Sequence, residues 1–74
     1  MSWQVGLDAD FADWLVGQQQ EVRREIMAHA RLLEQMGPQL ARPYVDTVKG
    51  SRFKNMKELR VQIGGDPWRV LFAF

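Results

Sequence analysis

A cluster of turn-forming residues, Gly-Gly-Asp-Pro at positions 64–67, separates two segments of alternating apolar and polar residues. Apolar side chains occupy every second position of residues 59–63 before the turn and of residues 68–74 after it. This period of two around a glycine-rich turn is typical of a β-hairpin with one buried face. A turn centred in the cluster predicts that Ile63 lies opposite Trp68, so that the cross-strand pairs on this face are all apolar.

The opposite face of the predicted hairpin carries charged side chains. Glu58, Arg60 and Arg69 share this face because side chains alternate along a strand. In the expected register, Arg69 lies diagonal to Arg60, about 7–8 Å away at the backbone, so two guanidinium groups can hold one phosphate. Glu58 is the carboxylate nearest to them in the sequence. It is a candidate proton acceptor or, equally, a partner that neutralises Arg60.

The charge of the chain is divided unevenly. Residues 1–48 carry four basic and seven acidic side chains, a net charge of −3, whereas residues 49–74 carry six basic and two acidic ones, a net charge of +4. A basic half attracts polyanions such as nucleic acid, in a manner that weakens with salt. The basic half, which includes Arg52, Lys54 and Lys57, is therefore a candidate polyanion-binding surface, although charge alone is equally consistent with a solvated basic surface.

The N-terminal half predicts one short strand and two helices. Alternation in residues 2–7 indicates an opening strand. Asp8 is expected to cap a first helix that ends at Gly17, and apolar residues at helical spacing predict a second helix over residues 18–36. With a further short strand at residues 45–49, the order is βααβββ. This is an α+β domain in which two helices pack on one face of an antiparallel sheet.

Length and composition limit the classes of protein that remain. Residues 1–74 make one domain near the size at which a single core is only marginally stable, so self-association or a partner is expected. The chain has no cysteine and no long apolar run, which favours a soluble protein of the reducing cytoplasm without a thiolate metal site. His29 lies mid-helix and is expected on the helix surface or in the core. No metal or cofactor is predicted.

Four segments resemble the HigB-like (phage Gp49-like) branch of the RelE/ParE toxin superfamily. They are Gly37-Pro-Gln-Leu-Ala-Arg-Pro43, Asp46-Thr-Val-Lys-Gly-Ser-Arg52, Asn55-Met-Lys-Glu-Leu-Arg60 and Trp68-Arg-Val-Leu-Phe-Ala-Phe74. The resemblance implies a two-helix layer on an antiparallel sheet, ribosome-dependent mRNA cleavage, and neutralisation by an antitoxin that commonly has a helix-turn-helix domain. Members of this branch look longer, with a further C-terminal strand and helix, so the chain is expected to be C-terminally truncated.

Cleavage of RNA by its 2′-hydroxyl requires a phosphate held in line, stabilisation of its added charge, and a proton acceptor. We assign Arg60 and Arg69 to the phosphate and Glu58 to the acceptor, with Arg52, Lys54 and Lys57 positioning the backbone. Two alternatives use the same fold: a ParE-type toxin that inhibits a topoisomerase, and a non-catalytic remnant that only binds antitoxin.

Overall fold

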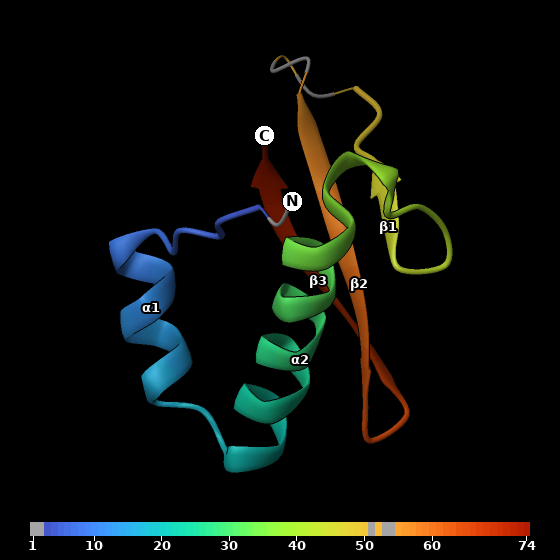
Figure 1. The fold of residues 1–74 in the computed structure, drawn as a ribbon. Helices are drawn as coiled ribbons and strands as arrows, with labels where there is room; N and C mark the ends of the chain where they lie inside the picture. The colour runs from blue at the N-terminus through green and yellow to red at the C-terminus, as the bar shows by residue number, and fades with distance from the viewer. Residues whose placement is uncertain (1–2, 51, 53–54) are drawn as a thin grey trace.

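A computed structural model describes residues 3–50, 52 and 55–74 of the chain. Within these residues, two α-helices and a short 3₁₀ helix precede a three-stranded antiparallel sheet in the order β1-β2-β3 (Figure 1). The elements are α1 (Ala9–Val16), α2 (Gln20–Met36), η1 (Gly37–Gln39), β1 (Val45–Thr47), β2 (Met56–Ile63) and β3 (Asp66–Ala73). The predicted α+β class is confirmed. Helix α2 lies against the sheet, and α1 lies beside α2 (Figure 1).

The helix ends lie at, or within two residues of, the positions that the sequence indicates. The Asp8 carboxylate accepts hydrogen bonds from the backbone N–H groups of Asp10 and Phe11, at 3.1 and 3.2 Å, which satisfies donors that the first turn leaves free. Helix α1 ends before Gly17, as expected. Helix α2 begins at Gln20, two residues later than predicted, and ends at Met36, where Gly37 adopts a positive φ of 57°.

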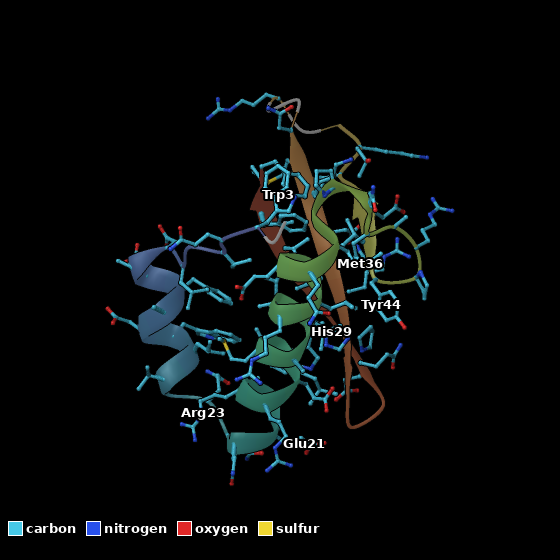
Figure 2. The ribbon with its side chains drawn as sticks, in the orientation of Figure 1. Trp3, Glu21, Arg23, His29, Met36 and Tyr44 are labelled. Atoms are coloured by element: carbon cyan, nitrogen blue, oxygen red, sulfur yellow. The ribbon has the colours of Figure 1, made fainter. Side chains whose placement is uncertain are left out.

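The predicted opening strand is wrong in the described residues, where 3–7 form no β-ladder. Instead, the backbone N–H of Trp3 donates to the carbonyl of Glu34 in the last turn of α2, at 2.7 Å. That carbonyl would ordinarily bind the N–H four residues later, but residue 38 is proline and has none. The Trp3 side chain lies over Gly37, where a Cβ atom would overlap the indole ring (Figure 2). The element order is therefore ααβββ.

The β2–β3 hairpin forms with the predicted faces but in a different register. Its turn consists of Gly64 and Gly65, whose φ values of 58° and 87° suit a two-residue turn that twists with the strands. Ile63 consequently pairs with Asp66 and Val61 pairs with Trp68, so the predicted Ile63–Trp68 pairing is wrong by two residues. A shift of two leaves every side chain on its original face, because the strand period is also two.

The core lies between α2 and the inner face of the sheet. Its buried members are Leu15, Val22, Ile26, Leu33, Leu40, Val45, Leu59, Val61 and Ile63. Val61 is only 1% exposed, and burying such a side chain contributes about 1.5–3 kcal/mol. Because α2 covers this inner face, the opposite or outer face of the sheet presents the polar side chains. Among the described helices, none combines the length and apolar character that a membrane span requires.

Candidate functional site

The outer face of the sheet brings the two predicted arginines together. Arg60 on β2 and Arg69 on β3 are directly paired across the hairpin, closer than the diagonal arrangement expected from the sequence. Like charges directly opposite each other on neighbouring strands repel, which destabilises a sheet unless other groups offset the repulsion. The side chain of Arg69 is 69% exposed and that of Arg60 is 41% exposed, so solvent reaches both guanidinium groups.

Glu58 supplies the offsetting charge between the arginines. Its Oε2 lies 3.2 Å from Nε of Arg69 and its Oε1 lies 3.6 Å from a terminal guanidinium nitrogen of Arg60. The ion pair between Glu58 and Arg60 that the sequence suggested is therefore present, together with a second pair to Arg69. Glu58 is buried, which strengthens these interactions relative to pairs in open water. Its role as a proton acceptor stays a prediction.

A second carboxylate, Asp46 on β1, extends this arrangement. Its Oδ2 lies 3.0 Å from guanidinium nitrogens of both Arg42 and Arg60, and its Oδ1 accepts the backbone N–H of Thr47 at 2.8 Å. The hydrogen bonds from Arg42 and Thr47 lower the pKa of the Asp46 carboxyl from its ordinary value. Because a charged donor and a backbone N–H both favour the ionised form, Asp46 stays anionic well into acid.

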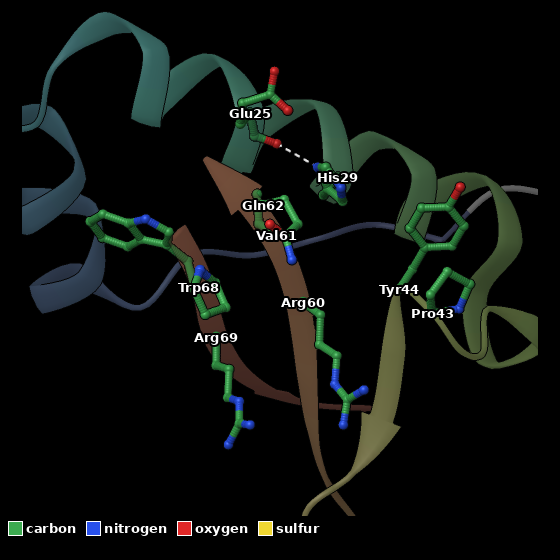
Figure 3. A pocket seen from close by; sticks show the side chains of 10 residues that line it. Glu25, His29, Pro43, Tyr44, Arg60, Val61, Gln62, Trp68 and Arg69 are labelled. Carbon is green, nitrogen blue, oxygen red and sulfur yellow. Dashed lines mark hydrogen bonds between the residues drawn. The ribbon is translucent and has the colours of Figure 1, made fainter. Parts of the chain in front are cut away.

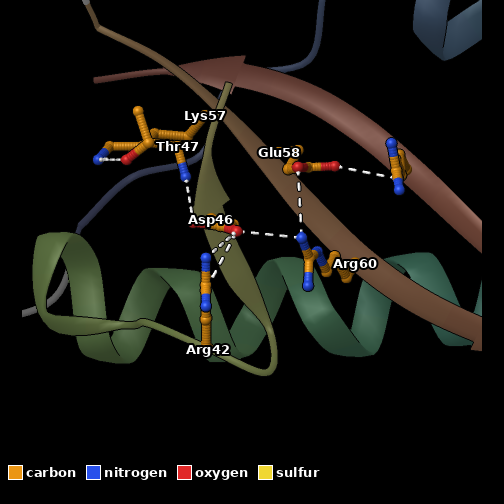
Figure 4. A network of polar contacts seen from close by, with 7 residues as sticks. Arg42, Asp46, Thr47, Lys57, Glu58 and Arg60 are labelled. Carbon is orange, nitrogen blue, oxygen red and sulfur yellow. Dashed lines mark hydrogen bonds and ion pairs between the residues drawn. The ribbon is translucent and has the colours of Figure 1, made fainter. Parts of the chain in front are cut away.

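These five side chains form a row of alternating charge, which we call the charge ladder (Figure 4). The ladder runs Arg42, Asp46, Arg60, Glu58, Arg69. Sequence reasoning missed Asp46 and Arg42 because they lie in and before a short strand whose pairing with β2 was not assigned. Their spacing of four residues was the one available signal. The charge ladder contains three arginines and two carboxylates, so it has one positive charge in excess, which suits an anionic ligand.

Of the remaining predicted cations, Lys57 does not lie on the outer face. Lys57 alternates with Glu58 along β2 and therefore points to the opposite side, where its Nζ donates to Oγ1 of Thr47 at 2.9 Å. Arg52 is exposed in the loop before β2. Lys54 lies outside the described residues. The structure thus unites Arg60, Arg69 and Glu58 and leaves Lys57 apart from them.

A cavity of about 580 Å³ adjoins the ladder (Figure 3). Helix α2 contributes Glu25 and His29 to its walls, and the segment before β1 contributes Tyr44. The hairpin contributes Arg60 and Arg69, whose guanidinium groups extend away from His29 and Tyr44 toward the carboxylates of the ladder (Figure 3). His29 is half-buried on α2 with its Nδ1 bonded to the carbonyl of Glu25, which agrees with the expected helix position, and it also lines this cavity.

The hydrogen bond of His29 fixes which of its ring nitrogens carries the proton. Nδ1 lies 2.7 Å from the carbonyl oxygen of Glu25, and a carbonyl can only accept. Nδ1 is therefore the donor, and Nε2 of the neutral ring is an acceptor. Among the described residues, no group of three or more His, Asp or Glu side chains is arranged to hold a metal ion. The arrangement can bind an anion and accept a proton.

Comparison with known proteins gives matches over most of the chain. The family described as Phage derived protein Gp49-like matches residues 13–74. Two Mycobacterium tuberculosis proteins are also similar. "Putative toxin HigB2" is 47% identical over 74 residues, 95% of this chain and 37% of that protein. "Putative toxin HigB3" is 43% identical over 61 residues, 82% of this chain and 52% of that protein. The chain thus spans about a third to a half of these relatives, and no solved structure matches it.

Proposed function

Because this chain belongs to the phage-derived Gp49-like family, we propose that it is the toxin component of a type II toxin-antitoxin system. Its proposed activity is ribosome-dependent cleavage of mRNA, which inhibits translation. The observation that carries this proposal is the direct pairing of Arg60 and Arg69 on a solvent-accessible face. The similarity to two proteins named as toxins supports the same conclusion.

In the proposed reaction, Arg60 and Arg69 hold the scissile phosphate and stabilise its added charge. Arginine suits this role because its planar fork of donors matches a phosphate and its charge persists at any physiological pH. Arg60 also has a donor to spare. Its Nε is buried without a hydrogen-bond partner among the described residues, whereas its terminal nitrogen already serves Asp46 and Glu58. A phosphate that draws the guanidinium outward would satisfy it.

One carboxylate of the ladder has a proposed role in the chemical step. Glu58 is the proposed proton acceptor for the attacking 2′-hydroxyl, and it becomes available when phosphate takes over the charge of the arginines. Arg52, Lys54 and Lys57 are proposed to contact the RNA backbone on either side of the cleaved bond. The proposed partners are the ribosome with its mRNA and an antitoxin with a helix-turn-helix domain, and the proposed location is the cytoplasm.

One observation supports a second candidate function. Both arginines already have carboxylate partners within the chain, so the outer face is close to electrically balanced before any ligand arrives. A balanced face suits a protein partner. The second candidate is therefore a module that binds antitoxin without cleaving RNA.

Induced expression in a bacterial host tests the choice between these candidates. We expect the chain to arrest growth and to create new 5′ ends within translated messages. Arg69→Ala should reduce cleavage at least tenfold, because a charge-assisted contact contributes about 1.5–3 kcal/mol. Arg31→Ala, an exposed arginine on α2, serves as the matched control and should have no effect. Folded protein that binds antitoxin but creates no new 5′ ends would favour the binding module. Growth arrest in which a topoisomerase is inhibited and messages stay intact would favour the ParE-type activity.

A further inference from the structure

Asp46 belongs to the charge ladder but takes no part in the proposed chemical step. It lies directly opposite Glu58 where β1 pairs with β2, and the guanidinium group of Arg60 reaches both carboxylates (Figure 4). Two carboxylates placed in this way repel each other unless a cation lies between them. We propose that Asp46 is a positioning residue, which fixes the guanidinium group of Arg60 in the direction of the scissile phosphate. This inference rests on the proposed function and deepens it by naming a residue that prepares the same site.

The two carboxylates hold Arg60 unequally. Oδ2 of Asp46 lies 3.0 Å from Nη2 of Arg60, which is a hydrogen-bond distance, whereas Oε1 of Glu58 lies 3.6 Å from the same nitrogen, which is too far for one. The other oxygen of Glu58 lies 3.2 Å from Nε of Arg69. Asp46 is therefore the firmer anchor of Arg60, and Glu58 is the partner that a phosphate displaces more easily.

Asp46 is itself held in place, as an anchor must be. Its Oδ2 accepts a hydrogen bond from Nε of Arg42 at 3.1 Å in addition to the one from Arg60, and its Oδ1 accepts the backbone N–H of Thr47 at 2.8 Å. Both oxygens are thus engaged, so the carboxylate cannot rotate without losing a partner. A supporting group locked by its own hydrogen bonds can lock the orientation of the group that it contacts.

The anchor leaves donors of Arg60 available for a ligand. The contacts of this guanidinium group with Asp46 and Glu58 both involve Nη2. Among the described residues, none forms a hydrogen bond with Nε or Nη1 of Arg60. Because Nη2 is fixed to β1, the direction of these remaining donors is fixed as well. Donors oriented in advance stabilise developing charge without reorganising, so loss of the anchor should slow cleavage more than it weakens binding.

Asp46→Asn tests this expectation, because it keeps the shape of the anchor and removes its charge. With purified ribosomes and one message, we expect the maximal cleavage rate to fall about tenfold or more, since misplacement of a group acts on the chemical step. RNA affinity should stay equal or rise, because a negative charge leaves the face. Asp46→Glu restores a carboxylate and should recover part of the rate. Asp13→Asn makes the same charge change on the exposed side of α1 and should alter neither quantity.

A measurement on the purified chain examines the anchor without the reaction. Nε of Arg60 is buried, which slows exchange of its proton with water and allows NMR to follow the motion of this side chain. We expect the Arg60 guanidinium group to be ordered in the wild type and mobile in Asp46→Asn. Arg42→Ala removes only the outer support of Asp46 and should produce a smaller change in the same direction. Arg31→Ala, an exposed arginine on α2, is its matched control.

The two measurements separate this inference from the proposed function. A folded Asp46→Asn variant in which Arg60 stays ordered, or in which the maximal cleavage rate is unchanged, would overturn the proposal. If Asp46→Asn does not fold, Arg42→Ala decides, and effects no larger than those of Arg31→Ala would overturn it. A wild-type chain that cleaves no message would refute the proposed function, while mobility of Arg60 in Asp46→Asn would still establish the anchor.

Discussion

Glu58 offsets the repulsion between the two arginines of the outer face. It contacts both arginines, which would otherwise face each other unscreened across β2 and β3. Two roles compete for it, since a carboxylate that neutralises the arginines opposes phosphate binding, whereas a proton acceptor takes part in the reaction. The two roles predict different behaviour for an uncharged variant of the same shape.

Glu58→Gln is expected to lower the free energy of unfolding by about 1–3 kcal/mol, because it removes a buried, charged acceptor from two donors. It should also strengthen RNA binding, since both guanidinium groups are released. Urea unfolding and RNA titration measure the two effects. Glu21→Gln, an exposed carboxylate in the first turn of α2, is the matched control. A folded Glu58→Gln variant that binds RNA but no longer cleaves it would assign the proton acceptor, whereas retained cleavage would exclude that role.

Asp46 should make the stability of the chain sensitive to acid. Its pKa is lowered from the ordinary value of 3.8 by hydrogen bonds from Arg42 and Thr47. Its contribution to stability is therefore present above that value and is lost as the pH falls through the lower pKa of the folded state. We expect the free energy of unfolding to drop in this acid range, and Asp46→Asn to show a smaller drop. Denaturant unfolding at a series of pH values measures it. Asp13→Asn, on the exposed side of α1, should keep the full drop, and identical profiles for wild type and Asp46→Asn would contradict the assignment.

At the scale of elements, the hairpin shows what a sequence can specify. Alternation fixes which side chains share a face, so the outer position of Glu58, Arg60 and Arg69 was predictable. The register was not, because the turn cluster allows several centres, all related by shifts of two residues that keep the same faces. The choice falls to Gly64 and Gly65, the two residues that adopt positive φ.

The remaining differences also have local causes. Residues 3–7 have the alternation of a strand, but Pro38 leaves a helix carbonyl free and Trp3 binds it instead. The contact of Asp46 with Arg60 spans fourteen positions and follows from a three-residue strand that periodicity indicates only weakly. The two helices, with their cap at Asp8 and stop at Gly37, depend on neighbouring residues, and this is why they were predicted well.

Gly64→Ala is expected to lower the free energy of unfolding by about 1–2 kcal/mol, since an alanine at a φ of 58° brings its Cβ against the backbone. No atom beyond residues 63–65 was found within 4 Å of the added Cβ, so the effect comes from the local backbone conformation and not from a clash with other parts of the fold. Thermal or urea unfolding measures it. Gly64→Asn should cost less, because asparagine tolerates this conformation. Gly17→Ala, at a φ of −79° with room for a Cβ, should be neutral or slightly stabilising. Equal losses at positions 17 and 64 would contradict the turn assignment.

At the scale of the whole molecule, the outer edge of β3 remains open. The N–H of Arg60 points toward β1, so the residues on either side of it pair with β3 through Trp68 and Val70. The backbone groups of Arg69, Leu71 and Ala73 consequently point away from β2, and no described strand pairs with them. Such an edge is a template for another strand.

We therefore predict that the chain associates with itself at micromolar concentration through β3. Leu71 is 62% exposed on this strand, and Leu71→Lys should shift the protein toward monomer because a charge at an edge opposes strand pairing. Sedimentation measures the distribution of species. Val16→Lys, which replaces an exposed apolar residue on α1, should leave that distribution unchanged. A wild-type chain that sediments as a monomer at every concentration would refute the prediction.

The contact between Trp3 and Phe74 has a consequence for the order in which the chain can mature. Their rings pack edge to face with centroids 5.4 Å apart, and the same indole lies over Gly37 at the end of α2. During synthesis, Trp3 and α2 are made long before Phe74 exists. The N-terminal segment can thus dock on the helix early but packs against Phe74 only after β3 has been translated. The packing of Trp3 against Phe74 can therefore form only late in synthesis, once β3 has been made.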